Sequence, residues 1–124
     1  EEHLRHHTDE ARRVLGLGGT VLGAFDEELL VGYATLRPDL EPGVAQLADM
    51  QVSLSHRRRG IARRLIEEVI RRARESGAGR LYVSSCPSES AVGLYRSLGF
   101  DLVDKPHPEL FELEPEDVHM IRDV

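Results

Sequence analysis

The chain has 124 residues, 40% of them hydrophobic and 31% charged, and carries a formal net charge of −6 at pH 7. This length fits a single domain, residues 1–124, and the acidic balance argues against nucleic-acid binding and favours cationic partners. The single cysteine, Cys86, excludes an internal disulfide and favours a reducing, cytoplasmic setting. We expect neither a membrane span nor a signal peptide, because no apolar run is long enough and no such pattern opens the sequence.

The first fifteen residues have the pattern of a helix. His3, His6 and His7 stand three and four positions apart on it, a spacing compatible with metal ligation. Histidines without a carboxylate or cysteine cluster beside them are more often exposed to solvent, so we expect no metal. The glycines of residues 16–19 precede a β-rich run rather than follow one, which favours a helix end and a turn over a dinucleotide-binding loop.

Three β-rich runs follow. Thr20–Phe25 and Leu29–Leu36 are joined by a short acidic turn and predict a hairpin. Residues 37–43 contain two prolines and a glycine and predict a loop. The third strand is expected over Val44–Leu54, where the apolar positions change from odd to even near Leu47 and Ala48. Such a change of phase indicates a β-bulge.

A long amphipathic helix is expected from near Arg59 to Glu75. Its apolar stripe contains Ile61, Ala62, Leu65, Ile66, Val69, Ile70 and Ala73. Opposite charges stand four positions apart on the other face, in the pairs Arg63–Glu67, Arg64–Glu68, Glu67–Arg71, Glu68–Arg72 and Arg71–Glu75.

The start of this helix predicts an anion site. A helix N-terminus presents unpaired backbone N–H groups and the positive end of the helix dipole. Gly60 and Ala62 leave room for a phosphate to approach those groups, and Arg57, Arg58 and Arg59 add cationic donors.

The remaining elements are a strand at Leu81–Ser84, a helix that Ser88 caps, and two β-rich runs at Phe100–Val103 and Val118–Val124. The first of these strands is expected to run parallel to its predecessor, because a helix connects the two. The chain is therefore predicted to be an α/β domain whose ligand crevice lies at the carboxyl ends of the parallel strands.

Two motifs resemble the GNAT superfamily of N-acetyltransferases. Arg57-Arg58-Arg59-Gly60-Ile61-Ala62 is similar to its pyrophosphate loop, [Gln/Arg]-x-x-Gly-x-[Gly/Ala], and lies between a strand and a long helix. The segment from Ser88 to Phe100 is similar to the family's Asn-x-x-Ala-x-x-Leu-Tyr-x-x-x-Gly-Phe segment. The resemblance implies a mixed central sheet flanked by helices, with acetyl-CoA as cosubstrate. It also implies an opening strand, which we expect to be missing from this sequence.

The resemblance also implies roles for particular residues. The pyrophosphate would lie on the turn from Arg57 to Arg63, which comprises Arg57, Arg58, Arg59, Gly60, Ile61, Ala62 and Arg63. Backbone groups of Met50 and Val52 would pair with the pantetheine arm. Tyr95 would act as general acid toward the departing thiolate, with an ordinary core tyrosine as the alternative. Ser88 occupies a position where the family often has asparagine, so it either contacts pantetheine or only caps its helix.

The general base is left open. Some family members carry a glutamate at the position of Gln46, and an amide cannot usefully accept a proton. Asp49 is the nearest carboxylate on the strand, His119 is a further candidate, and a water relay is an alternative. Cys86 has no strong base beside it in sequence, so we expect a small buried residue rather than a nucleophile.

Three functions remain open on the sequence alone. The first is an N-acetyltransferase acting by direct attack of an amine, in a small molecule or a peptide, on the thioester. The second is a non-catalytic acyl-CoA-binding regulatory domain. The third is a nucleic-acid-binding helix built on the arginines, which the net charge disfavours. A homodimer is left open.

Overall fold

The computed structural model describes residues 15, 16 and 18–124. They form a six-stranded sheet in the order β1-β2-β3-β4-β6-β5. The strands are β1 (Thr20–Asp26), β2 (Leu29–Glu41), β3 (Val44–Val52), β4 (Arg80–Ser85), β5 (Asp101–Leu102) and β6 (Val118–Asp123). β3 and β4 are parallel and the other neighbours antiparallel, so the predicted mixed sheet is confirmed. The predictions about an opening strand and the three histidines lie outside the described residues.

The predicted hairpin is confirmed, but the predicted loop over residues 37–43 is wrong. β2 continues to Glu41, and only Pro42 and Gly43, which has a φ of +78°, form the turn into β3. Pro38 lacks a backbone N–H and is tolerated inside β2 because pairing with β3 is irregular between Arg37 and Glu41.

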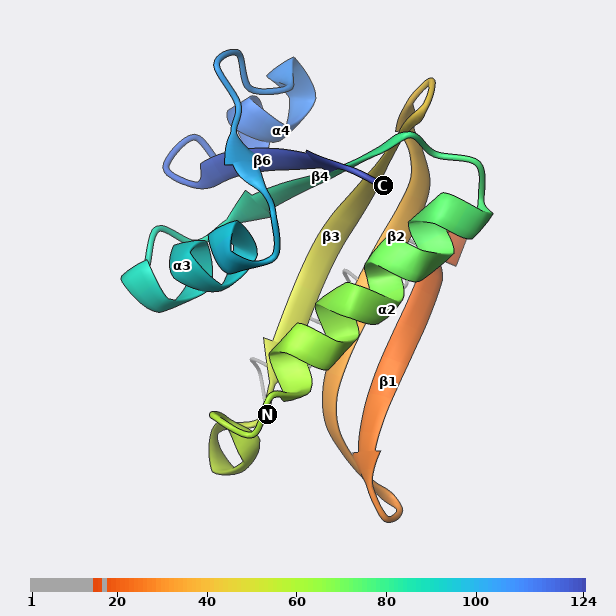
Figure 1. Cartoon of the computed structure of the whole chain (residues 1–124), viewed down its shortest axis with the longest axis vertical. Helices are drawn as coiled ribbons and strands as arrows, with labels where there is room; N and C mark the ends of the chain where they lie inside the picture. Colours follow the sequence, from red (N-terminus) through yellow and green to blue (C-terminus); the bar gives the residue numbers. More distant parts are fainter. Residues whose placement is uncertain (1–14, 17) are drawn as a thin grey trace.

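Helix α2 (Ile61–Glu75) covers β1, β2 and β3, as Figure 1 shows. Its buried residues are Leu65, Ile66, Val69, Ile70 and Ala73, all within the predicted apolar stripe. They pack in one cluster with Ala34 and Leu36 of β2 and Ala45 and Leu47 of β3. Burial of each large side chain contributes roughly 1.5–3 kcal/mol, so this contact fixes the helix against the sheet.

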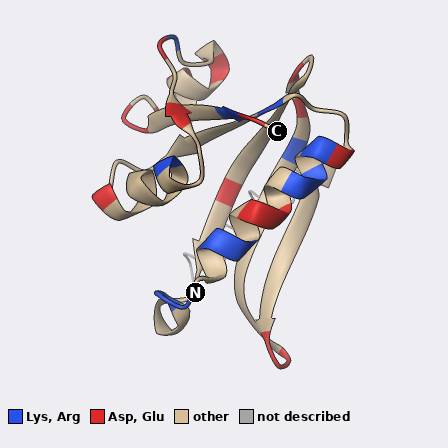
Figure 2. Ribbon diagram, in the orientation of Figure 1, with Lys and Arg blue, Asp and Glu red and all other residues tan. Residues whose placement is uncertain are grey.

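Some of the ion pairs that the spacing predicts occur on the exposed face of α2. Glu68 pairs with Arg72, and Arg71 pairs with both Glu68 and Glu75, so two of the five predicted pairs occur. The alternation of charge along the helix is visible in Figure 2. The hydrogen bond from Arg71 is the main cause that lowers the pKa of Glu68 to about 2. These groups are exposed, so the pairs add little to stability.

Two further helices lie on the β4–β6 side of the molecule (Figure 1): α3 (Glu89–Ser97) and α4 (Pro108–Leu113). The sequence did not predict α4. Its Leu110 packs with Leu40, Val44 and Tyr82 in a second, smaller core. A short 3-10 helix, η1 (Leu54–His56), connects β3 to the turn before α2. Within the described residues, no helix is long and apolar enough to cross a membrane.

Candidate active site

The parallel strands β3 and β4 separate before they end. Their pairing stops at Leu47 and Val83, although β3 continues to Val52 and β4 to Ser85. The β2–β3 register passes from Leu36–Leu47 to Thr35–Asp49, so Ala48 is an extra residue in β3. This confirms the predicted bulge. A bulge bends and twists its strand, which accounts for the wedge that opens between β3 and β4.

A cavity of about 260 Å³ occupies this wedge. The residues that line it are Leu47, Ala48, Asp49, Met50, Gln51, Val83, Ser84, Ser85, Cys86, Tyr95, Glu114 and Asp117. The cavity therefore receives side chains from both separated strands, from α3 and from the segment between α4 and β6. Tyr95 and Asp49, the two residues predicted to be catalytic, both line it.

Tyr95 lies in α3 and is 5% exposed, with its ring edge-on to Phe100 at a centroid distance of 5.4 Å. Burial raises the pKa of its hydroxyl, and the nearby Cys86 and Asp49 raise it further. The phenol therefore stays protonated at neutral pH. A protonated phenol at the end of a cavity can donate a hydrogen bond to an anion that forms there.

Asp49 lies directly after the bulge and points to the opposite face of the sheet from Met50. The Tyr33 hydroxyl donates a hydrogen bond of 2.7 Å to its Oδ2, and Thr35 Oγ1 donates to its backbone oxygen at 3.4 Å. Met50 and Val52 pack toward the main core. Beyond Leu47, the edge of β3 that faces β4 has no strand partner within the described residues, so its backbone groups can pair with an extended ligand.

The turn before α2 has the geometry of an anion site. Gly60 is the N-cap residue with a φ of +79°, Arg58 has a φ of +65°, and no side chain caps the helix. These two left-handed residues explain why the helix begins at Ile61 rather than near Arg59. The first turn contains no acidic residue, so nothing in it competes for the exposed N–H groups.

A second cavity of about 220 Å³ adjoins this turn. Its lining comprises Val52, His56, Arg57, Arg58, Gly60, Ile61, Ala62, Arg63 and Leu94. Arg63 also donates from Nη2 to Ser97 Oγ at 3.1 Å, which ties α2 to α3. Six of the seven residues predicted to hold the pyrophosphate thus surround one cavity. The seventh, Arg59, lines a groove on the other side of α2.

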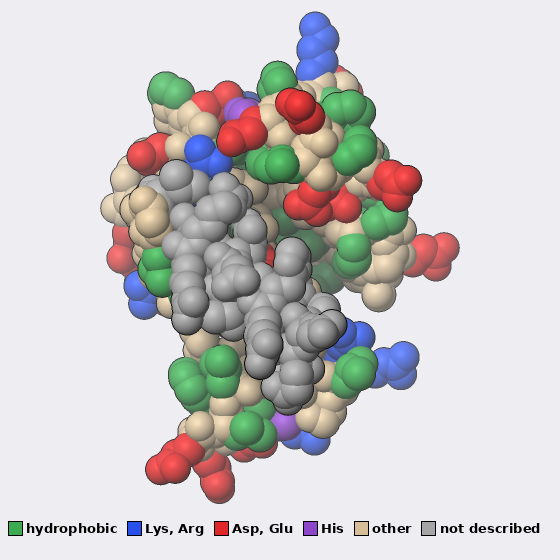
Figure 3. All heavy atoms as spheres, turned by 180° about the vertical axis from the view of Figure 1, so that it is seen from behind, with side chains coloured by type: hydrophobic (Ala, Val, Ile, Leu, Met, Phe, Trp, Pro, Cys, Tyr) green, Lys and Arg blue, Asp and Glu red, His purple; other side chains and the backbone are tan. Residues whose placement is uncertain are grey.

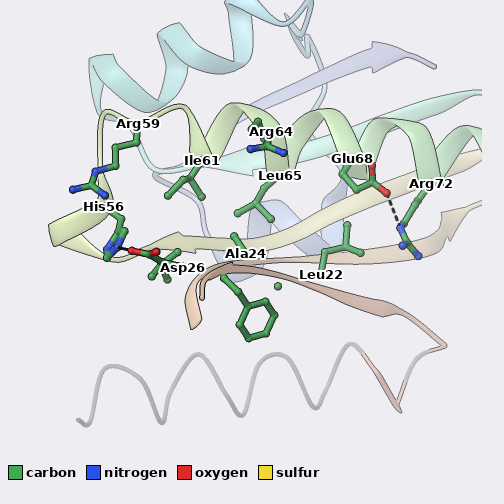
Figure 4. Close-up of a pocket in the computed structure, with 13 residues that line it drawn as sticks. Leu22, Ala24, Asp26, His56, Arg59, Ile61, Arg64, Leu65, Glu68 and Arg72 are labelled. Carbon is green, nitrogen blue, oxygen red and sulfur yellow. Dashed lines mark hydrogen bonds and ion pairs between the residues drawn. The ribbon is translucent and has the colours of Figure 1, made fainter. Parts of the chain in front are cut away.

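That groove, of about 700 Å³, lies between α2 and β1 (Figure 4). Leu22, Ala24, Ile61 and Leu65 are among the side chains that point into it, and a 2.9 Å contact between His56 Nε2 and Asp26 Oδ2 closes one end. It is the larger space, but it includes neither Tyr95 nor the separated ends of β3 and β4. The two residues predicted to be catalytic, Tyr95 and Asp49, line the wedge cavity and not this groove.

Ser88 and Cys86 lie between β4 and α3. Ser88 is the N-cap of α3, and its Oγ accepts a hydrogen bond from the backbone N–H of Ala91 at 3.2 Å, so the predicted cap is confirmed. The prediction that Cys86 is a small buried residue is wrong. Cys86 is exposed, because it follows the last residue of β4 at the open end of the wedge.

Gln46, at the position of the family's glutamate, and His119, the further candidate for the base, are absent from the cavity lining. Gln46 is 4% exposed, and its Oε1 is buried without a hydrogen-bond partner among the described residues. His119 is 5% exposed, and its Nδ1 lies 2.7 Å from the hydroxyl oxygen of Tyr82. That hydroxyl also accepts a hydrogen bond from the backbone N–H of His107 at 2.9 Å. His119 therefore lies against Tyr82 of the second core and not in the wedge.

Sequence reasoning missed Glu114 and Asp117, which line the wedge cavity from the segment after α4. No local pattern marks them, because only the tertiary fold brings this segment to β4. In the part of the chain that the structure describes, no group of three or more metal-ligating side chains occurs.

Comparison with known proteins decides the family. The model of the Acetyltransferase (GNAT) family matches residues 1–100. The chain belongs to this family. GNAT acetyltransferases are acyl-CoA-dependent transferases, and the predicted family is thereby confirmed.

Several curated relatives resemble this GNAT chain. The uncharacterized protein ML0378 of Mycobacterium leprae is 31% identical over 104 residues, which cover 82% of this chain and 28% of the relative. N-acetyltransferase 8B of Homo sapiens is 35% identical over 82 residues, which cover 62% of this chain and 36% of the relative. The uncharacterized N-acetyltransferase YsnE of Bacillus subtilis is 29% identical over 106 residues, which cover 83% and 68%. The GNAT chain thus spans only about a third of the first two relatives.

Solved structures confirm the GNAT fold. An acetyltransferase of Bacillus subtilis in complex with CoA superposes with a TM-score of 0.77 at 19% identity, covering 94% of this chain and 83% of that one. A GNAT-family acetyltransferase of Staphylococcus aureus superposes with a TM-score of 0.76 at 24% identity, covering 88% of this chain and 70% of that one. At these identities the likeness concerns the fold alone.

Proposed function

We propose that the chain is an N-acetyltransferase that moves an acetyl group from acetyl-CoA to an amine by direct attack on the thioester. The observation that carries the proposal is the wedge between β3 and β4, which holds a buried tyrosine and lies beside an uncapped, arginine-rich helix N-terminus. Relatives of known structure support the cosubstrate, because one is in complex with CoA and another has acetyl-CoA bound.

In this proposal acetyl-CoA binds along three features of the chain. Its pyrophosphate accepts hydrogen bonds from the first turn of α2 and from Arg57 and Arg58, since phosphate is stabilised at a helix N-terminus. Its pantetheine arm pairs with backbone groups of Met50 and Val52 on the side of β3 that faces β4, as an added strand would. Its thioester then reaches the cavity that Tyr95 lines.

The chemistry exchanges one bond for another. The amine nitrogen attacks the carbonyl carbon, the new C–N bond forms, the C–S bond breaks, and CoA leaves as a thiolate. Tyr95 donates its hydroxyl proton toward the sulfur as negative charge develops there. Asp49, directly or through a water, accepts the proton that the attacking nitrogen loses, and solvent restores both groups.

One observation favours a second function, a non-catalytic acyl-CoA-binding domain. Gln46 replaces the glutamate that some family members carry, and its buried amide cannot accept a proton. The two functions share the phosphate site and differ only in turnover. In either case the expected setting is cytoplasmic, and the expected partner is a small-molecule or peptide amine rather than a nucleic acid.

The test combines binding with turnover. Calorimetric titration of CoA onto the protein measures binding, and release of free CoA from acetyl-CoA in the presence of an amine panel measures catalysis, with the acetylated product identified by mass. We expect both. Binding without turnover across the panel would favour the non-catalytic domain, and absence of CoA binding would exclude both functions.

A further inference from the structure

A histidine ties the turn before α2 to the β1–β2 hairpin. His56, at the end of η1, is the only residue from 53 to 60 that is not exposed, and its side chain is 11% exposed. Its Nε2 lies 2.9 Å from Oδ2 of Asp26, the last residue of β1. Figure 4 shows this contact at the end of the groove between α2 and β1. Two segments that are far apart in the sequence are fastened together there.

The contact belongs to a chain of hydrogen bonds. Ser53 Oγ lies 3.0 Å from Ser55 Oγ, and Ser55 Oγ lies 2.8 Å from His56 Nδ1. An ionised carboxylate can only accept, so Nε2 donates to Asp26, and a neutral ring then accepts from Ser55 through Nδ1. Both ring nitrogens are engaged, which fixes the orientation of the ring. Ser55 lines neither of the two spaces that His56 lines, so these groups orient the histidine rather than present a serine to a substrate.

His56 stands between the groove and the cavity at the start of α2. It lines both spaces, whereas Asp26 lines the groove and not the cavity. In the view from behind, acidic side chains and arginines lie on either side of a histidine at the lower end of the molecule (Figure 3). Asp26 can therefore influence a ligand in the cavity in two ways, through His56 or through its own charge.

The turn before α2 has a backbone conformation that needs support. Arg58 has a φ of +65°, which residues with a side chain rarely adopt, and it is followed two positions later by Gly60 at +79°. Residues 57–60 are all exposed, so burial contributes little to holding them in place. If such a turn changes conformation when it is empty, binding must reorder it, and the reordering weakens the measured affinity. A contact that keeps the turn in its binding form strengthens binding without touching the ligand.

We infer that His56 and Asp26 are positioning residues for the cosubstrate, and that the tip of the β1–β2 hairpin thereby controls CoA affinity. This inference rests on the proposed function. The imidazole, held by Asp26, keeps Arg57, Arg58 and the backbone N–H groups at the start of α2 directed toward the cavity that receives the pyrophosphate.

The charge of Asp26 acts in the opposite direction from its contact with His56. A carboxylate near a phosphate repels it, so on charge alone the removal of Asp26 should strengthen CoA binding. Loss of the contact should weaken CoA binding, because the turn is then no longer held. The sign of the change in Kd therefore separates the two effects.

Calorimetric titration of CoA onto Asp26→Ala tests the inference. The side chain of Asp26 is 54% exposed, so the replacement should leave the fold intact, which thermal unfolding checks. We expect Kd to rise about fivefold, the equivalent of one hydrogen bond of ordinary strength. Asp26→Asn keeps an oxygen that accepts from Nε2, and its Kd should lie within about twofold of that of the unaltered protein. An unchanged or lower Kd in Asp26→Ala would overturn the inference.

Glu28→Ala is the matched control. It removes the same charge from the same hairpin, at an exposed turn residue that lines neither the groove nor the cavity. Its Kd for CoA should be unchanged or slightly lower, as the loss of a negative charge predicts. A rise equal to that of Asp26→Ala would attribute the effect to the hairpin in general and overturn the role of the histidine contact.

The dependence on His56 is tested with a double variant. If Asp26 acts through the histidine, Asp26→Ala should not raise Kd any further in a His56→Ala background. An equal rise in both backgrounds would contradict the inference, because Asp26 would then act without the histidine.

The kinetic constants separate positioning from chemistry. Neither Asp26 nor His56 lines the wedge cavity, so the KM for acetyl-CoA should rise in Asp26→Ala while kcat at saturating acetyl-CoA stays level. A fall in kcat with an unchanged KM would overturn the inference. Absence of CoA binding in the unaltered protein would exclude the proposed function and the inference with it. CoA binding that does not depend on Asp26 would overturn the inference alone.

Discussion

The N-termini of α2 and α3 are built in opposite ways. At α3 the chain satisfies its own helix end, because Ser88 accepts a hydrogen bond from the backbone N–H of Ala91 and Glu89 places an acid in the first turn. At α2 the cap is Gly60, without a side-chain acceptor, and no acid follows. A helix end that its own chain leaves unsatisfied is available to a ligand, and one that is capped is not.

The two helices are also expected to contribute to different steps, α2 to cosubstrate binding and α3 to the acetyl transfer. α2 contributes its backbone end and the arginines beside it, which suit a phosphate. α3 contributes a side chain from its interior, Tyr95, which burial keeps protonated. We therefore expect variants at α2 to change CoA affinity, variants at Tyr95 to change turnover, and variants at the cap of α3 to change stability.

Tyr95→Phe should have the largest effect. The ring and its edge-on contact with Phe100 are kept, so folding and CoA affinity should barely change. Only the proton donor is lost, and a positioned acid contributes roughly 10²–10⁴-fold. We expect kcat to fall by at least ~10²-fold, measured by release of free CoA. Full activity, or a large loss of thermal stability, would instead indicate an ordinary core tyrosine.

Gly60→Val should weaken CoA binding next most strongly, by roughly 10–100-fold in the Kd measured by calorimetry, the equivalent of one or two lost charge-assisted contacts. The added side chain blocks the approach of a phosphate to the backbone, and valine is also strained at a φ of +79°. Gly77→Val is the matched control, because Gly77 has a φ of +94° and open space around it but follows the other end of α2. Equal losses of affinity in both variants would attribute the effect to strain alone.

The sequence predicted most of what lies along one continuous stretch of chain. The bulge at Ala48 follows from a change of apolar phase, the turn at Gly60 from its motif, and the cap at Ser88 from its position before a helix. Each of these depends on interactions between residues that are close in sequence.

The failures come from interactions between distant segments. β2 extends through Pro38 because β3 lies beside it, which overrides the local preference of proline for a loop. Glu114 and Asp117 reach the cavity only because β6 pairs with β4 and carries the preceding turn to it. Cys86 is exposed because of where the wedge opens, and the residues next to it in sequence do not indicate that position.

Ser88→Ala sharpens the contrast between the two helix ends with a smaller effect. Loss of an N-cap acceptor typically costs about 1 kcal/mol of unfolding free energy, which chemical denaturation measures. If Ser88 only caps α3, the Kd for CoA should stay within about twofold, too small for a lost hydrogen bond. Ser90→Ala, in the first turn of the same helix, is the control. A marked loss of CoA affinity only in Ser88→Ala would show that this serine also contacts the cosubstrate.

The last prediction is that kcat does not change with pH between about pH 8 and pH 10. An exposed tyrosine has a pKa near ~10, so a catalytic acid of that kind would lose its proton, and its activity, as the pH approaches 10. Burial raises the pKa of Tyr95, with the charges of Cys86 and Asp49 adding to the effect, so the active protonated form should persist beyond pH 10. We therefore expect kcat at saturating substrates to stay level from about pH 8 to pH 10, since kcat reports groups in the bound complex. The residual activity of Tyr95→Phe over the same range is the comparison. A fall in kcat below pH 10 in the unaltered protein, absent from Tyr95→Phe, would show that Tyr95 titrates like an exposed phenol. Burial would then not be what keeps its hydroxyl protonated.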